Sequence, residues 1–146
     1  MIFLNKYLKE IGIDENYWLF TDRKVDKRAL PDEEGFVLSE FFSLDVSLAI
    51  YIYSHLCYFK EHCLHGVPSC FLYDKNGNHI DFEIGKKKWT KKIDEMIDGF
   101  KMIIASDEYI EKYINEPDYD KRKIEQKKII EKGLKVFIKY YSNLWC

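Results

Sequence analysis

The stretch SLDVSLAIYIYSHLCYFKEHCLH, residues 43–65, is the most apolar part of the chain and decides the fold class. Between residues 35 and 59 the only charged side chains are Glu40 and Asp45, although a third of the whole chain is charged. Apolar residues recur there at steps of three and four and also occupy a second side, so the helix is either a core helix or a membrane span. The apolar run is short for a span and contains Asp45, Ser54 and His55. We therefore predict a buried central helix over Ser43 to His65, around which the other helices pack.

Helical periodicity continues on both sides of this segment. The pattern predicts a short amphipathic helix over residues 2–11 and two long helices over residues 86–106 and 119–145. Residues 108–114 either extend the helix over residues 86–106 or form a separate turn. Residues 14–40 contain Pro31 and Gly35 and are expected to form an ordered loop. Gly133 costs its helix about 1 kcal/mol relative to Ala, which predicts a close contact with another helix there.

Residues 70–84, CFLYDKNGNHIDFEI, carry the strongest hairpin signal in the chain. An Asn76-Gly77 turn follows three apolar residues, and Ile80, Phe82 and Ile84 then alternate with polar neighbours. We therefore predict one all-α domain over residues 1–146, a bundle of about four helices with one inserted β-hairpin.

Composition limits the partners and the compartment. The net charge of −2 argues against general affinity for nucleic acids or membranes. No signal peptide precedes the first helix, so we expect a cytoplasmic protein whose four cysteines are reduced. These are Cys57, Cys63, Cys70 and Cys146.

Three motifs resemble a family of small uncharacterised proteins encoded by bacteriophages and prophages, mostly of Gram-positive hosts. A W-S-L-D segment that begins a long helix is matched by residues 42–45, and the H-G-Y-P-S turn that ends it by residues 65–69. The segment W-x-x-x-L-D-x-M-I-x-x-F is matched by residues 89–100, and the family's C-terminal G-L-x-L-F-x-K-Y-F-x-x-L-W by residues 133–145. Phe42, Val67 and Cys146 depart from the family's usual residues. The resemblance implies a helical phage protein in the cytoplasm of an infected bacterium, one of a class that often counters host defence.

A candidate ligand site lies at the predicted start of the helix over residues 86–106. Lys86, Lys87 and Lys88 precede Trp89 at a helix N-terminus, where backbone amides favour an anion. For a nucleotide-type ligand, Arg28 and Lys88 would meet phosphate, Trp89 would stack on a base and His65 would supply a hydrogen bond. The alternative is a solubilising lysine cluster beside a Trp89 that belongs to the core.

Metal binding and catalysis have weaker signals. His62, Cys63, His65 and Cys70 carry zinc-ligand chemistry but contain no Cys-x-x-Cys pair, and no nucleophile motif surrounds either cysteine. We predict no metal, no cofactor and no catalytic residue. The lysines between residues 121 and 139 are interpreted as a solvated helix face or a docking surface for an acidic protein, not as a specific nucleic-acid site.

The function expected from these observations is that of a non-enzymatic phage protein that counters antiviral defence. The first hypothesis is sequestration of a nucleotide second messenger by a homo-oligomer that shares a pocket between protomers. The alternative is direct binding to a host defence protein, and a metal- or thiol-dependent enzyme is a minor third possibility.

Overall fold

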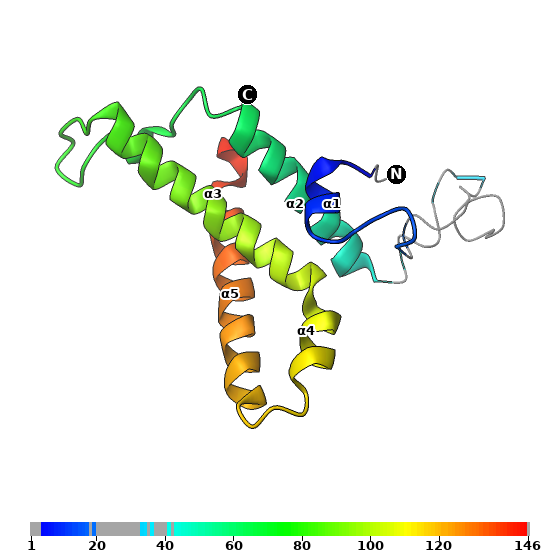
Figure 1. The fold of residues 1–146 in the computed structure, drawn as a ribbon. Helices are drawn as coiled ribbons and strands as arrows, with labels where there is room; N and C mark the ends of the chain where they lie inside the picture. Colours follow the sequence, from blue (N-terminus) through cyan, green and yellow to red (C-terminus); the bar gives the residue numbers. More distant parts are fainter. Residues whose placement is uncertain are drawn as a thin grey trace.

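The fold is helical throughout the part of the chain that the computed structural model describes, which comprises residues 4–17, 19, 33–34, 36, 41 and 43–145. Five α-helices follow one another in these residues, and no strand is present among them. They are α1 (Lys6–Glu10), α2 (Leu44–His62), α3 (Phe82–Ile104), α4 (Ser106–Tyr113) and α5 (Tyr119–Tyr140), with short 3₁₀ turns at Ser69–Phe71 and Tyr141–Asn143 (Figure 1). Most of the loop predicted over residues 14–40 lies outside the described residues.

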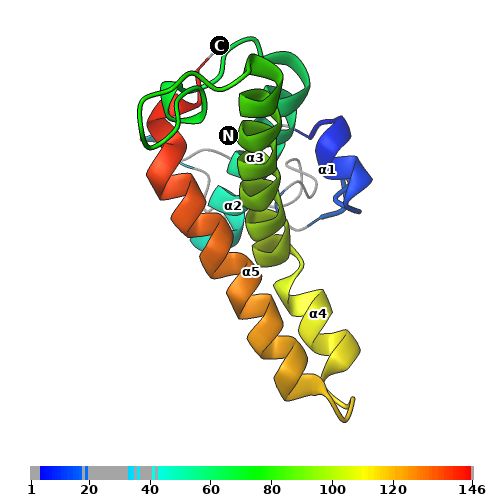
Figure 2. The ribbon, with the colours of Figure 1, turned by 90° about the vertical axis from the view of Figure 1, so that its left-hand side faces the viewer.

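The helix at the centre is α3, and α2 and α5 both pack against it (Figures 1 and 2). Trp89, Ile93, Met96 and Phe100 recur at steps of four and three along α3 and are all buried, because the amphipathic period turns them to one face. The apolar segment over residues 43–65 does form a long helix, but it does not take the central place. One of its sides stays open to solvent, as the exposed Leu48 and Tyr58 show.

The short helix α1 is fixed to the end of α2. The Asn5 side chain caps α1 by accepting hydrogen bonds from the amides of Tyr7 and Leu8, and Leu8 is fully buried. Glu61 at the end of α2 accepts hydrogen bonds from Lys6 Nζ at 2.8 Å and from the Tyr7 hydroxyl at 2.6 Å. These contacts place α1 on the side of α2 that faces away from α5 (Figure 2).

The predicted β-hairpin is present only as its turn. Gly77 has a φ of +79°, and a single antiparallel bridge joins Tyr73 to His79. The residues expected to form the second strand instead begin α3, because the Asp81 carboxylate accepts hydrogen bonds from the amides of Glu83 and Ile84 and caps the helix. The alternation that ends at Ile84 is therefore the first turn of a helix, and the prediction of an inserted hairpin is not supported beyond its turn.

The helices α4 and α5 extend beyond the rest of the body as an antiparallel pair (Figure 2). Their contact includes a hydrogen bond from the Tyr109 hydroxyl to the Arg122 carbonyl at 3.3 Å. The Arg122 guanidinium also lies 4.4 Å from the centre of the Tyr113 ring, as in a cation–π contact. None of the helices in the described residues has the length and apolar character that crossing a membrane requires.

Candidate functional site

Of the four residues predicted to contact a ligand, the structure describes three, and one of these, Trp89, cannot take its predicted role. Trp89 is 1% exposed, and its ring packs against Phe71 and Tyr140 with centroid separations of 5.6 and 5.7 Å. It therefore has no free face on which a base could stack. Trp89 is a core residue, which was the alternative to a ligand contact in the sequence analysis. Lys88 on α3 and His65 after α2 are both exposed, and Arg28 lies outside the described residues.

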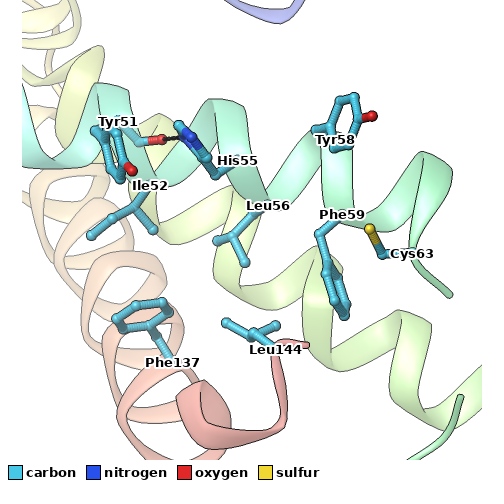
Figure 3. A pocket seen from close by; sticks show the side chains of 9 residues that line it. All are labelled: Tyr51, Ile52, His55, Leu56, Tyr58, Phe59, Cys63, Phe137 and Leu144. Atoms are coloured by element: carbon cyan, nitrogen blue, oxygen red, sulfur yellow. Dashed lines mark hydrogen bonds between the residues drawn. The ribbon is translucent and has the colours of Figure 1, made fainter. Parts of the chain in front are cut away.

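An apolar cavity lies between α2 and the end of α5, and we call it the α2–α5 groove. Its volume is about 410 Å³, within the range of sites that bind small molecules or the side chains of a partner. Figure 3 shows its walls: one comes from α2 and the other from the end of α5 and the turn that follows. The lining residues are Tyr51, Ile52, His55, Leu56, Tyr58, Phe59, Cys63, Phe137 and Leu144.

The floor of the groove is set by the helical period of α2. Ile52, Leu56, Phe59 and Cys63 follow one another at steps of four and three, so they share the side of α2 that faces α5. Opposite them, Phe137 packs edge-to-face on Phe100 of α3, with centroids 5.1 Å apart and planes at 85°. The floor is thus built on the core, and its shape depends on how α2 and α5 both rest on α3.

The rim of the groove on α2 is aromatic. Tyr51 and His55 stack with a centroid separation of 4.0 Å and an interplanar angle of 29°. His55 Nδ1 also lies 2.7 Å from the Tyr51 carbonyl oxygen (Figure 3). A carbonyl only accepts, so this contact requires the proton on Nδ1 and makes Nε2 of the neutral ring a hydrogen-bond acceptor. Together with the Tyr51 and Tyr58 hydroxyls, Nε2 provides the polar chemistry at the edge of an otherwise apolar groove.

Among the described residues that line the groove there is no Lys, Arg, Asp or Glu. Phosphate groups are bound in proteins mainly by arginine, lysine and backbone amides. The groove supplies no such cation, whereas its aliphatic and aromatic walls suit apolar side chains or a flat apolar ring. Its chemistry therefore favours an apolar ligand surface over a phosphate-bearing one.

The cysteines differ from one another in state. Cys63 is disulfide-bonded, so the expectation that all four cysteines are reduced is wrong for this residue. Cys57 and Cys70 are free thiols, and burial raises the pKa of the Cys57 thiol. Within the described residues, no three His, Cys, Asp or Glu side chains gather closely enough to hold a metal ion. The combination of His62, Cys63, His65 and Cys70 also lacks the Cys63 thiolate that a zinc site would use.

A second hollow, of about 380 Å³, lies between α3 and α5 and is lined mainly by lysines and glutamates. Glu95 accepts a hydrogen bond from Lys92 at 2.8 Å and pairs with Lys132 at 3.2 Å. Burial alone would raise the pKa of Glu95, but these two lysines outweigh it and lower that pKa. This surface is therefore an ion-paired face between α3 and α5.

The groove was missed from the sequence because its two walls are far apart along the chain. The α2 wall could be predicted in part, because the spacing of the apolar residues at 44, 48, 52, 56, 59 and 63 indicates one apolar side of the helix. Nothing in that pattern identifies Phe137 and Leu144 as the opposite wall. Comparison of the chain with protein-family models, with curated proteins and with solved structures finds no match.

Proposed function

We propose that the chain is a non-enzymatic binding protein, and that the α2–α5 groove receives the apolar face of an amphipathic helix from another protein. The observation that carries the proposal is the groove itself. It is about 410 Å³ in volume, aromatic at its rim, and without an ionised side chain among the described residues that line it. Grooves of this kind bind helices that present apolar side chains at i, i+3 or i+4, and i+7.

The rim gives the bound helix an orientation. His55 Nε2 accepts a hydrogen bond from a polar residue that flanks the apolar face, and the Tyr51 and Tyr58 hydroxyls donate to or accept from the same flank. Aromatic side chains with one polar tip are frequent in binding surfaces because they combine a large apolar area with a hydrogen-bonding group. The binding free energy then comes from the floor, and the rim selects the register of the helix.

The nucleotide hypothesis has less support than direct protein binding. It relied on Trp89 to stack on a base, and Trp89 is in the core. It also placed Arg28 and Lys88 on phosphate; Arg28 lies outside the described residues, and the α2–α5 groove has no cation among its described lining residues. The resemblance to phage proteins supplies the biological setting of the proposal. In that setting the partner is a host defence protein in the cytoplasm of an infected bacterium, and the groove inhibits or redirects it by covering one of its helices.

A selection experiment tests the groove with helical peptides in place of the natural partner. A displayed library of such peptides is selected on the wild-type protein, and the recovered peptides are measured against two variants. Leu144→Glu places a charge in the groove, whereas Ile124→Glu places the same charge on α5 at a side chain that is already 55% exposed. We expect the recovered peptides to be amphipathic, to lose at least tenfold in affinity for Leu144→Glu and to keep their affinity for Ile124→Glu.

The same protein is incubated with a nucleotide library, desalted and heated, and the released molecules are identified by mass spectrometry. No retained nucleotide is the result expected for a helix-binding groove. An intact nucleotide that is retained by the wild type and by Leu144→Glu would support the sequestration hypothesis instead. A chemically converted nucleotide would identify an enzyme and contradict the proposal.

A further inference from the structure

The solvent-facing side of α2 carries a continuous row of apolar and aromatic side chains, which we call the α2 stripe. Leu44, Leu48, Tyr51 and Tyr58 are 47%, 52%, 47% and 55% exposed, so the rest of the described chain does not cover them. Steps of four and three alternate along the row, which is the spacing of the contact seam in helices that pair side by side. The six members are Leu44, Leu48, Tyr51, His55, Tyr58 and His62.

The spacing of the α2 stripe is the same when it is read in either direction. The pairs 44 and 62, 48 and 58, and 51 and 55 all have their midpoint at residue 53. Two copies of α2 that run antiparallel, with a two-fold axis at the level of residue 53, therefore bring each member of the row opposite another member. This is the self-complementarity that an isologous dimer interface requires.

The charges at the ends of α2 favour the antiparallel arrangement over the parallel one. Asp45 lies in the first turn, and Lys60 and His62 lie in the last turn. Antiparallel pairing brings Asp45 near the last turn of the second copy, where His62 lies on the α2 stripe; Lys60 of that turn is paired with Asp94 of its own copy, and Glu61 with Lys6. Parallel pairing would bring two Asp45 carboxylates together and align the two helix dipoles, and both effects are unfavourable.

From these observations we infer that the protein forms a homodimer in which two α2 helices pack antiparallel through the α2 stripe. Leu48 of each copy lies against Tyr58 of the other, and the stacked Tyr51 and His55 rings of the two copies meet at the two-fold axis. Leu44 of each copy lies against His62 of the other. The α2 stripe shares Tyr51, His55 and Tyr58 with the rim of the α2–α5 groove, so the dimer covers part of that rim and leaves the floor open.

The two-fold axis has a consequence for the grooves. The axis is perpendicular to both α2 helices, and a two-fold rotation does not change directions parallel to its axis. A side of α2 that points along the axis in one copy therefore points in the same direction in the other copy. The floor residues Ile52, Leu56 and Phe59 lie about a quarter turn around α2 from the α2 stripe, at 100° per residue. The dimer therefore presents both grooves on one face, with the Tyr51, His55 and Tyr58 rims between them.

The available surface predicts a dimer that dissociates on dilution. The α2 stripe runs along a helix of 19 residues, about 28 Å in length. Side chains that are about half exposed offer on the order of 500 Å² per copy over such a row, and stable complexes bury about 800 Å² per partner.

Sedimentation equilibrium over a range of concentrations tests the dimer. The weight-average mass of the wild type is expected to rise from 17.6 kDa toward twice that value as the concentration increases. Leu48→Glu should remain monomeric at every concentration, because it places a charge in the α2 stripe. Ile124→Glu, with the same charge at a similarly exposed position on α5, should dimerise like the wild type, and so should the groove variant Leu144→Glu. Circular dichroism establishes that each variant is folded.

The orientation is tested with a pair of charges. Leu44→Glu alone should be monomeric, and adding His62→Lys to the same chain should restore the dimer, because positions 44 and 62 face each other only in the antiparallel arrangement. A folded double variant that remains monomeric would contradict the antiparallel pairing. A wild type that stays monomeric at all concentrations, or a Leu48→Glu variant that dimerises as well as the wild type, would overturn the dimer itself.

Discussion

Gly99 of α3 and Gly133 of α5 face each other across the helix crossing with no side chain between them. A Cβ atom built on Gly133 would lie 2.6 Å from the Gly99 Cα and 2.8 Å from the Glu95 carbonyl oxygen, and one built on Gly99 would lie 2.7 Å from the Gly133 Cα. The crossing confirms the close helix contact that Gly133 predicted. Because α2 also rests on α3, this spacing sets the distance between the two walls of the α2–α5 groove.

Replacing Gly133 with Ala should therefore destabilise the protein. In an open helix the change would stabilise by about 1 kcal/mol through helix propensity, but overpacking against backbone costs about 1–3 kcal/mol. Because the close contacts of the added methyl group are with backbone atoms, the cost falls in the upper half of that range, and we expect a net loss of about 1–2 kcal/mol in the free energy of unfolding, measured by urea denaturation. Lys135→Ala, at an exposed position on α5, should change that free energy by no more than about 0.5 kcal/mol. A Gly133→Ala variant as stable as the wild type would mean that the helices are not in contact here.

The core position of Trp89 predicts a stability effect in place of a ligand effect. Trp89→Ala should lower the free energy of unfolding by about 3–5 kcal/mol, because it leaves a cavity beside Phe71 and Tyr140. Trp89→Phe should lower it less, since a ring is kept. Trp145→Ala is the matched control, because Trp145 is 66% exposed, and it should cost less than about 1 kcal/mol. Equal losses from Trp89→Ala and Trp145→Ala would contradict the core assignment.

The contacts of Glu61 predict a loss of stability in acid. Hydrogen bonds from Lys6 and then from Tyr7 lower the pKa of Glu61, so the folded state holds its carboxylate in the ionised form. The ionised Glu61 carboxylate stabilises the folded state at pH values above the pKa of glutamate in the unfolded chain, about 4.3. This stabilisation is lost as the pH falls through the lower pKa that Glu61 has in the folded state. Urea unfolding at several pH values should show a smaller decrease on acidification for Glu61→Gln than for the wild type. Glu125→Gln, at an exposed position on α5, should follow the wild type.

The cysteines should react with iodoacetamide in a fixed order. Without reductant, Cys70 should be alkylated first because it is exposed, and Cys57 should follow slowly because burial raises its pKa and lowers the fraction of thiolate. Cys63 should be labelled only after reduction, since its sulfur is in a disulfide. Peptide mass mapping at successive times measures all three. Labelling of Cys63 without reductant would contradict the disulfide, and equal rates at Cys57 and Cys70 would contradict the burial of Cys57.

Periodicity predicted the long helices well, because the 3.6-residue pattern is strong in α3 and α5. It failed at residues 80–84, where a strand-like alternation coincides with the cap that Asp81 provides for α3. It also assigned the wrong place to α2. An apolar pattern shows that a helix face prefers to be covered, and it does not show whether this chain or another molecule covers it. The sequence allows Trp89 to be either a core residue or a ligand contact, and its packing against Phe71 and Tyr140 makes it a core residue.

The proposed helix-binding role of the α2–α5 groove is tested most directly by locating the bound peptide. The ¹⁵N-labelled protein is titrated with the tightest-binding peptide recovered from the helical library, and the amide shifts are followed by NMR. We expect saturable shifts at the floor residues, Ile52, Leu56 and Phe59 on α2 and Phe137 on α5, with Ile124 unchanged. We also expect Leu144→Glu to abolish these shifts at the same peptide concentrations. Saturable shifts that cluster away from the groove, or that persist unchanged in Leu144→Glu, would contradict the helix-binding role.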